Sequence, residues 1–253
     1  MEDECETYLS RLELTKIKDT DKCSLDSPLS LAELGSVLFK MKNGKSPGSD
    51  GFTVEFYKFF WVDLKPFIYA MCCESYDRGT MPQTLKEGII VLLPKSNKPK
   101  DMLKSYRPIT LLNVCYKIIS GAIAEKLKSV LKLTIDSCQT AYLKGRYIGD
   151  NIRMLYDIIQ HMNQEQISGV MLSLDVEAAF DSVSWHFIRK VLEAQNYPLS
   201  IIKWFDTLYA GSFARILDNG HLSGKNNYLD HVDRGERENI LLFRSMYKTH
   251  IHT

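Results

Sequence analysis

The residues with the clearest chemical potential lie in the stretch 173–183, SLDVEAAFDSV, of a 253-residue chain. A mostly apolar run, 170–174, ends on Asp175, and a helix-like segment follows. Short apolar runs that contain a β-branched residue predict a strand, so this carboxylate would lie at a strand's exit. Magnesium suits such a place, because it takes few protein oxygens and fills its shell with water and phosphates. Aspartate is equally a favoured helix cap, and the local pattern does not decide between the two interpretations.

A basic segment precedes this stretch. Residues 86–146 contain 12 Lys and Arg against 4 Asp and Glu, although the formal net charge of the whole chain is only +1. Such a segment can neutralise phosphates and release counterions, which makes binding salt-dependent. The alternative is a solvated surface that keeps the domain soluble. The small net charge argues against a uniformly basic nucleic-acid-binding protein.

Three motifs stand before the acidic stretch. Residues 43–51, NGKSPGSDG, predict a loop with positive-φ positions, and their spacing is not that of a P-loop. Residues 88–95 predict a strand closed by proline, and after a polar turn comes 105–113, SYRPITLLN. The third motif is 139–146, QTAYLKGR, in which glycine permits a close backbone approach.

These motifs, from about residue 43 to residue 217, resemble in type and order the reverse transcriptases of non-LTR (LINE-type) retrotransposons. The pairing of LPK with YRPITLLN is among the most specific signatures of that family, and SLDVEAAFDSV resembles its first catalytic motif. The resemblance implies an α+β fold of the right-hand polymerase type. The chain would supply the fingers and a partial palm, helix-rich with short strands.

The resemblance also implies roles at the reaction centre. Asp175 would be the catalytic carboxylate and a ligand of Mg²⁺ (or Mn²⁺), and the main-chain carbonyl of Val176 would complete the metal contact. Phe180 would lie against the sugar of the incoming nucleotide. Lys95 and Arg107 would reach its triphosphate, which leaves as a polyanion and needs fixed cations. Without the family, the same two residues read as a basic hairpin in which Arg107 pairs with a local carboxylate.

The template contacts implied by the resemblance are Lys45, Gln139 and Arg146, with Arg146 offered to a phosphate. The partners would then be an RNA template, a DNA primer and a dNTP. Lys45, read without the family, is one lysine in a turn.

The expected organisation has four parts: 1–24 a connector or tail, 25–147 fingers-like, 148–224 a partial palm and 225–253 an unrelated or frameshifted tail. Helices are expected at 30–41 with a capping box, 53–76, 113–133, 149–164, around 185–192 and at 199–209, and a strand at 213–217. The aromatic residues of 53–76 are expected in the core, with Pro66 kinking or dividing that helix.

Beyond about Gly224 the resemblance is expected to stop, because the family's Gln-Gly-Asp-Pro-Leu-Ser-Pro element and its Asp-Asp hairpin are not found. Two-metal phosphoryl transfer needs carboxylates from separate strands, which Asp175 alone does not supply. The chain by itself is therefore expected not to polymerise, and any metal to bind only if the site is completed. The alternatives are a non-catalytic nucleic-acid-binding remnant and a transposon-derived reading frame without a stable fold.

The six cysteines form no CxxC pair and have no histidine at finger spacing, so neither a zinc site nor a disulfide framework is expected. The start is acidic and lacks the apolar stretch of a signal peptide, and no apolar run is long enough to span a bilayer. We therefore expect an intracellular protein, nuclear or cytoplasmic.

Overall fold

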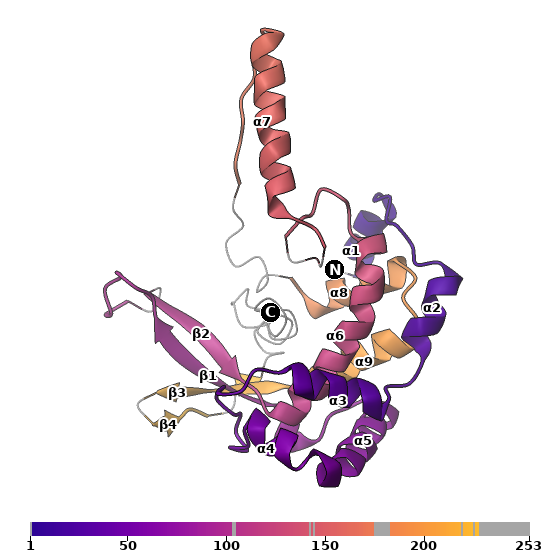
Figure 1. The fold of residues 1–253 in the computed structure, drawn as a ribbon, viewed down its shortest axis with the longest axis vertical. Coiled ribbons are helices and arrows are strands. Elements are labelled where there is room, and N and C mark those ends of the chain that lie inside the picture. The colour runs from indigo at the N-terminus through magenta and orange to yellow at the C-terminus, as the bar shows by residue number, and fades with distance from the viewer. Residues whose placement is uncertain are drawn as a thin grey trace.

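The computed structural model describes residues 2–102, 105–141, 143, 145–174, 183–218, 220–224 and 226–227. Asp175, Val176 and Phe180 lie outside these ranges. The described part is helix-rich with one small mixed sheet, so the predicted α+β class is confirmed (Figure 1). None of its helices is long and apolar enough to cross a membrane.

The helices are α1 (Glu2–Ser10), α2 (Asp19–Asp26), α3 (Leu31–Lys40), α4 (Val54–Phe59), α5 (Trp61–Arg78), the 3₁₀ turn η1 (Gln83–Leu85), α6 (Val114–Thr134), α7 (Ile148–Gln164), α8 (Trp185–Ala194) and α9 (Leu199–Tyr209). The strands are β1 (Glu87–Pro94), β2 (Tyr106–Leu111), β3 (Phe213–Asp218), β4 (His221–Leu222) and β5 (Asn226–Asn227). Each expected helix is present, and the predicted strands at 88–95 and 213–217 form β1 and β3.

The sheet has the order β2-β1-β3-β4, and β5 also pairs with β3. β1 and β2 form an antiparallel hairpin, whereas β1 and β3 run parallel. Ile90 of β1 and Ala214 of β3 are almost completely buried, which anchors this end of the sheet on the helical body. The other end of the hairpin projects away from the body (Figure 1).

Helix α3 begins with the predicted capping box. The Ser30 hydroxyl accepts a hydrogen bond from the Glu33 amide at 3.2 Å, and the Glu33 carboxylate accepts one from the Ser30 amide at 2.7 Å. The box satisfies two amides at the helix start that have no partner within the helix, and a cap of this kind is worth about 1 kcal/mol. Leu34 and Leu38 on the inner face are fully buried, as the pattern predicts.

One hydrophobic core joins the predicted fingers to the predicted palm. Leu34 and Leu38 of α3, Ile118 of α6, and Trp204 and Leu208 of α9 belong to the same buried cluster. The pairing of β3 with β1 crosses the same expected boundary at 147/148. Residues on both sides of 147/148 thus share one core, and the division into fingers-like and palm parts stays a prediction.

The N-terminal segment, expected as a connector or tail, packs on this body. Ile17 and Leu25 are 2% and 1% exposed and lie in a cluster with Tyr197. The Ile17 amide donates to the Gln195 carbonyl at 2.9 Å, and the Asn196 side chain donates to the Ile17 carbonyl at 3.2 Å. These contacts make residues 17–25 part of the fold.

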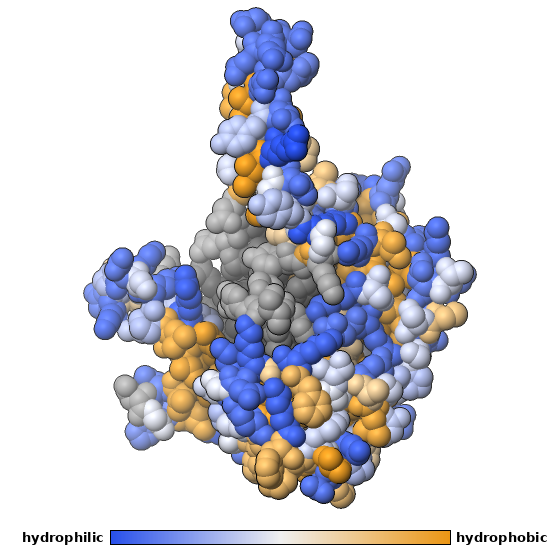
Figure 2. Space-filling view, viewed as in Figure 1, coloured by the Kyte–Doolittle hydropathy of each residue, from blue (hydrophilic) through white to orange (hydrophobic). Residues whose placement is uncertain are grey.

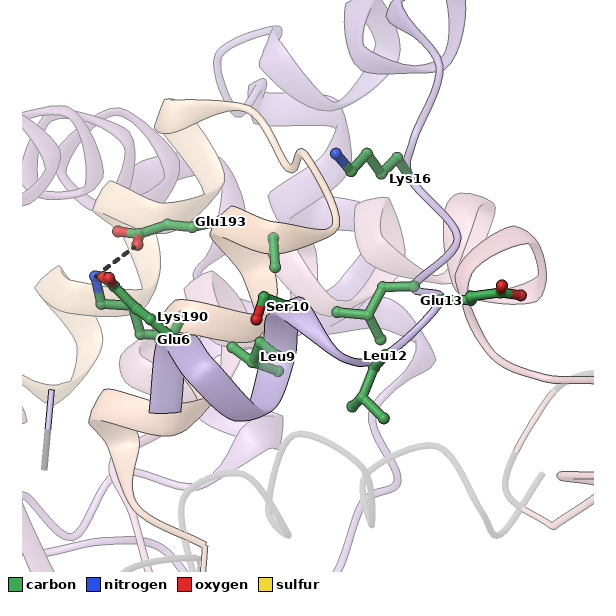
Figure 3. Close-up of a pocket in the computed structure, with 10 residues that line it drawn as sticks. Glu6, Leu9, Ser10, Leu12, Glu13, Lys16, Lys190 and Glu193 are labelled. Atoms are coloured by element: carbon green, nitrogen blue, oxygen red, sulfur yellow. Dashed lines mark hydrogen bonds and ion pairs between the residues drawn. The ribbon is translucent and has the colours of Figure 1, made fainter. Parts of the chain in front are cut away.

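A pocket lies between α1, the segment that follows it and α8 (Figure 3). At its wall the Lys190 ammonium is 2.7 Å from the Glu6 carboxylate and 3.6 Å from that of Glu193. The hydrogen bond to Glu6 raises the pKa of Lys190, and the same bond lowers the pKa of Glu6. The lysine thus serves to hold α1 on α8.

The aromatic segment 53–76 differs from its prediction in two ways. The break falls at Phe60, which ends α4 and begins α5, whereas Pro66 lies inside α5. The break turns Trp61 onto Gly35, where an added Cβ would meet the indole ring at 3.2 Å. The core assignment holds for Tyr57, but Phe59 and Phe67 are 80% and 72% exposed, so these two aromatic side chains lie outside the packed core.

The strand predicted to lead into Asp175 is not formed. Residues 168–174 have no regular structure, and Val170 and Leu174 are 95% and 80% exposed. A strand needs a neighbour to hydrogen-bond, and both edges of β1 are already taken by β2 and β3. The segment instead runs back beside α7, which buries none of its own residues (Figure 1).

Candidate nucleic-acid interface

The β1–β2 hairpin carries the two residues predicted to bind the nucleotide. Leu93 lies opposite Arg107, and the Lys95 amide donates to the Ser105 carbonyl at 2.7 Å, so pairing continues one step beyond β1. Side chains two positions apart on a strand share a face. The register therefore puts Lys95 and Arg107 on the same face of the hairpin, toward its projecting end.

The Arg107 side chain is exposed, and it makes no ion pair with any residue that the structure describes. The alternative in which Arg107 pairs with a local carboxylate is thus not found in this part of the chain. The turn beside it is held by the backbone and by Tyr106, whose hydroxyl donates to the Lys100 carbonyl at 2.9 Å. Hydrophilic side chains gather at this end of the hairpin, with apolar ones toward its base (Figure 2).

The 43–51 loop presents Lys45 from a segment that is fastened on one side by α4. The Gly44 amide donates to the Glu55 carboxylate at 2.5 Å, and the Lys58 ammonium donates to the Met41 carbonyl at 2.6 Å. The hydrogen bond from Gly44 lowers the pKa of Glu55. Gly44 has a φ of +70°, a conformation that glycine adopts without strain. Lys45 itself is exposed.

Arg146 has a different environment from the one predicted. Its guanidinium donates to the carbonyls of Gln139 at 2.6 Å, Ile135 at 2.8 Å and Lys132 at 3.4 Å, and also to that of Asp136. These are the carbonyls at the end of α6 and in the turn after it, where a helix leaves its last carbonyls without partners. These hydrogen bonds hold the turn, and the contact of Arg146 with a template phosphate stays a prediction.

Gln139 is exposed within the same turn. Its side-chain amide donates to the Ala141 carbonyl at 3.3 Å, and its own carbonyl accepts from Arg146. Gln139 and Arg146 thus lie together in one turn. Whether Gln139 contacts a template stays a prediction.

The lysines of α6 are likewise used inside the fold. Lys126, with a side chain only 8% exposed, donates to the Ser27 hydroxyl at 2.7 Å and lies 3.6 Å from the Glu33 carboxylate. Lys128 pairs with Glu125 at 2.8 Å. Burial lowers the pKa of Lys117, against the opposing charge of Asp50. The basic segment 86–146 is therefore divided between cations that face solvent on the hairpin and cations that hold the body together.

The predicted metal and sugar contacts are not tested by this geometry. Asp175, Val176 and Phe180 lie outside the described residues. Among the residues that are described, no group of three His, Cys, Asp or Glu side chains could hold a metal ion. The fit of Asp175 to Mg²⁺ therefore rests on the chemistry of its carboxylate.

Sequence reasoning did not find one residue at the centre of this region. Asn113, between β2 and α6, is 1% exposed, and its side chain joins the 43–51 loop to η1. Its only signal was a polar residue that ends the apolar run Leu111-Leu112 and precedes an amphipathic helix. That position is usually read as a helix cap.

A projecting basic hairpin beside a glycine-rich loop, on an α+β body, has the form of a polymerase's fingers. The chain matches the family "Reverse transcriptase (RNA-dependent DNA polymerase)" over residues 93–230, more than half of its length, and it belongs to that family. The family generally uses divalent metal ions and binds a nucleic-acid template and primer.

Three relatives indicate the kind of element. The chain is 32% identical over 245 residues to the transposon TX1 uncharacterized 149 kDa protein of Xenopus laevis, covering 97% of this chain and 18% of that protein. It is 25% identical over 175 residues to the Pol polyprotein of the type-1 retrotransposable element R1 of Bradysia coprophila, covering 68% and 17%. It is 23% identical over 241 residues to the probable RNA-directed DNA polymerase from transposon X-element of Drosophila melanogaster, covering 93% and 26%.

These relatives confirm the resemblance to LINE-type reverse transcriptases. The chain spans about a quarter or less of each relative's length. The match to the TX1 protein covers 245 of 253 residues and so includes part of 225–253. The origin of that segment stays a prediction.

Proposed function

We propose that this chain supplies the fingers and the first part of the palm to an RNA-directed DNA polymerase of a LINE-type element. The hairpin binds the incoming nucleotide through Lys95 and Arg107, and the 43–51 loop contacts the RNA template through Lys45. Asp175 and the Val176 carbonyl would hold Mg²⁺ once other carboxylates complete the site, and the ion would there neutralise charge on the transferring phosphate. Phe180 lies against the sugar of the dNTP.

The placement of Lys95 and Arg107 on one face of a projecting hairpin supports this proposal most directly. A triphosphate is a compact polyanion, and arginine grips phosphate oxygens in a bidentate way. The hydrogen-bonded ladder fixes the backbone positions of these two cations relative to each other before the ligand arrives. Arg107 is also exposed, so the ligand does not have to displace a described ion-pair partner.

The binding test is a salt titration of dNTP binding to the intact 253-residue chain held on a fluorescein-labelled RNA–DNA template-primer. The double variant Lys95→Ala/Arg107→Ala removes two cations that face the triphosphate, so dNTP affinity should fall and its salt slope should become shallower, whereas affinity for the template-primer without dNTP should not change. Lys16→Ala, an exposed lysine before α2, is the matched control and should leave the slope unchanged. An unchanged slope in the double variant would remove these residues from the interface.

A second candidate function is nucleic-acid binding without catalysis by this chain. The observation that favours it is the apolar run 170–174, which lies exposed and unpaired beside α7 instead of in a sheet behind Asp175. Template-primer binding would then be the same in Asp175→Ala as in the unsubstituted chain.

Primer extension with Mg²⁺ and dNTPs tests whether this chain by itself is a polymerase. We expect the 253-residue chain to bind the RNA–DNA duplex but not to extend the primer, because Asp175 alone does not supply the carboxylates for two metal ions. Extension that disappears in Asp175→Ala would show that other acids complete the site and that the chain is itself a polymerase.

A further inference from the structure

Asn113 occupies the junction of three segments. It follows β2, which carries Arg107, and precedes α6; its side-chain amide donates to the Thr84 carbonyl of the η1 region at 2.9 Å. Its side-chain oxygen accepts from the Asp50 amide at 3.3 Å and from the Ser49 hydroxyl at 3.4 Å. The side chain therefore uses both of its ends to join neighbours that are 29 to 64 residues away in the sequence.

The common explanation for asparagine at this position does not apply. Asn113 is the residue before the first turn of α6, where asparagine normally accepts a hydrogen bond from the helix's own amides. Here its side chain makes no such cap hydrogen bond. Asn113 is 1% exposed, and its side chain hydrogen-bonds to the 48–50 segment and to Thr84 instead of to the amides of its own helix. These contacts hold the side chain in place.

Gly48 shows how closely the loop is seated on this junction. A Cβ at Gly48 would lie 2.0 Å from the side-chain oxygen of Asn113 and 2.4 Å from its backbone nitrogen. Such distances are far inside van der Waals contact, so any larger residue would push the loop off Asn113. The Gly51 amide donates to the Gly48 carbonyl at 3.2 Å, which closes the loop into a turn at this end.

Lys45 lies between two parts of the 43–51 loop that are each hydrogen-bonded to other elements. On one side Gly44 and the preceding residues are held by Glu55 and Lys58 of α4. On the other, residues 48–50 are held by Asn113. We propose that Asn113 is a positioning residue, which fixes the Lys45 loop against the strand that carries Arg107 so that template and nucleotide contacts keep one spacing.

This inference rests on the proposed function, because it assigns the Lys45 loop to the RNA template. It goes beyond the proposed function in one respect: RNA binding by Lys45 depends on Asn113, which affects the RNA only by holding the loop. Preorganised contacts bind more tightly because no ordering of the loop has to occur on binding. The loss of Asn113 should then remove the benefit of Lys45 while leaving the protein folded.

The test is a double-variant cycle on the 253-residue chain with the labelled RNA–DNA duplex. Lys45→Ala and Asn113→Ala should each weaken binding about fivefold, and the double variant should also weaken it about fivefold, because residues that act through one element are not additive. Additive losses, about 25-fold in the double variant, would overturn the inference.

Two further variants separate positioning from a general loss of stability. Gly48→Ala pushes the loop and Asn113 apart without removing the Asn113 side chain, and it should reproduce the weaker binding even if Asn113→Ala does not fold. Thr207→Val removes a buried hydrogen bond to the Lys203 carbonyl in α9, and it should lower the melting temperature without changing affinity in the folded range. Equal weakening by Thr207→Val would assign Asn113 a purely structural role.

The failure of this inference is distinguishable from failure of the proposed function. If Lys45→Ala alone leaves affinity unchanged, the template assignment of the loop and the positioning role both fall, whereas the hairpin is judged by its own salt slope. If Lys45→Ala weakens binding but folded Asn113→Ala and Gly48→Ala do not, only the positioning role is overturned.

Discussion

The hairpin and the end of α6 carry similar cations but use them differently. On the β1–β2 hairpin, Arg107 is exposed without an ion pair to any described residue. At the end of α6, the Arg146 guanidinium donates hydrogen bonds to four backbone carbonyls. Nearer the middle of that helix, Lys126 is largely buried and contacts Ser27 and Glu33. Both regions belong to one basic segment in the sequence.

The difference follows from which backbone groups each region leaves unsatisfied. In a hairpin, the carbonyls that face the partner strand are paired along the ladder, so side-chain cations have little to bind nearby. A helix leaves its last four carbonyls without partners, and these attract a neighbouring arginine or lysine. A count of basic residues therefore overestimates the surface available to phosphates.

Arg146→Ala should give the largest effect and would test the structural half of this comparison. The loss of several hydrogen bonds from a charged group should lower the free energy of unfolding by about 2–4 kcal/mol. Urea denaturation measures this loss, and Arg146→Lys should restore only part of it because lysine lacks the planar fork. Unchanged stability together with weaker template-primer binding would instead support the predicted contact between Arg146 and a template phosphate.

Lys126→Met should have the next largest effect. Methionine keeps most of the buried stem but removes the hydrogen bond to Ser27 and the ion pair with Glu33, so unfolding should become easier by about 1–2 kcal/mol. The same denaturation experiment measures it, with Lys16→Met as the exposed control. A weakened affinity for the RNA–DNA duplex at unchanged stability would place Lys126 on the binding surface instead.

Arg107→Ala should have the opposite effect: affinity should fall, and stability should hardly change. Because the side chain is exposed, we expect stability to change by less than about 0.5 kcal/mol. Template-primer affinity in the presence of dNTP should fall by about fivefold, an effect of about 1 kcal/mol, as measured by fluorescence anisotropy. A large loss of stability without loss of affinity would show that the hairpin cations, like those of α6, are structural.

The smallest predicted effect is a pH dependence at the start of α3. Burial raises the pKa of Glu33, but the hydrogen bonds from Ser30 and the charge of Lys126 outweigh it, so the net pKa is lowered below 4.5. A lowered folded-state pKa contributes stability that is present above the unfolded-state pKa and is lost as pH falls through the folded value. Denaturation between pH 6 and about pH 3 should show a loss of tenths of a kcal/mol that Glu33→Gln removes. An identical pH profile in Glu33→Gln would contradict this assignment.

Local patterns were enough to predict most of the helices, although α2 was not among them. The spacing of Ser30 and Glu33 predicted the start of α3, and the spacing of apolar residues predicted α6, α7 and α9. Both patterns involve only residues within one or two helical turns of each other. The break in 53–76 was expected at Pro66 but falls at Phe60, and Trp61, the next residue, packs on Gly35. Gly35 lies 26 residues away and carries no local sign of that contact.

The candidate site divides in the same manner. The order of the motifs predicted the family, whereas the β1–β2 hairpin that carries Lys95 and Arg107 was considered only in the alternative interpretation. The strand before Asp175 was predicted from its apolar composition, but composition does not provide the neighbouring strand that a sheet requires. The role of Arg146 was also beyond local pattern, because its partners are carbonyls that every residue possesses.

The sequence by itself determined the family, the helices and the types of charged group available for binding. Only the tertiary structure decided which cations face solvent, which ones hold the backbone, and that Asn113 joins the 43–51 loop to the strand bearing Arg107. The physical reason is that side-chain identity sets what a group can bind, whereas the backbone groups brought near it set what it does bind. Hydrogen bonds between residues such as Asn113 and Asp50, 63 positions apart, leave no periodic trace in the chain.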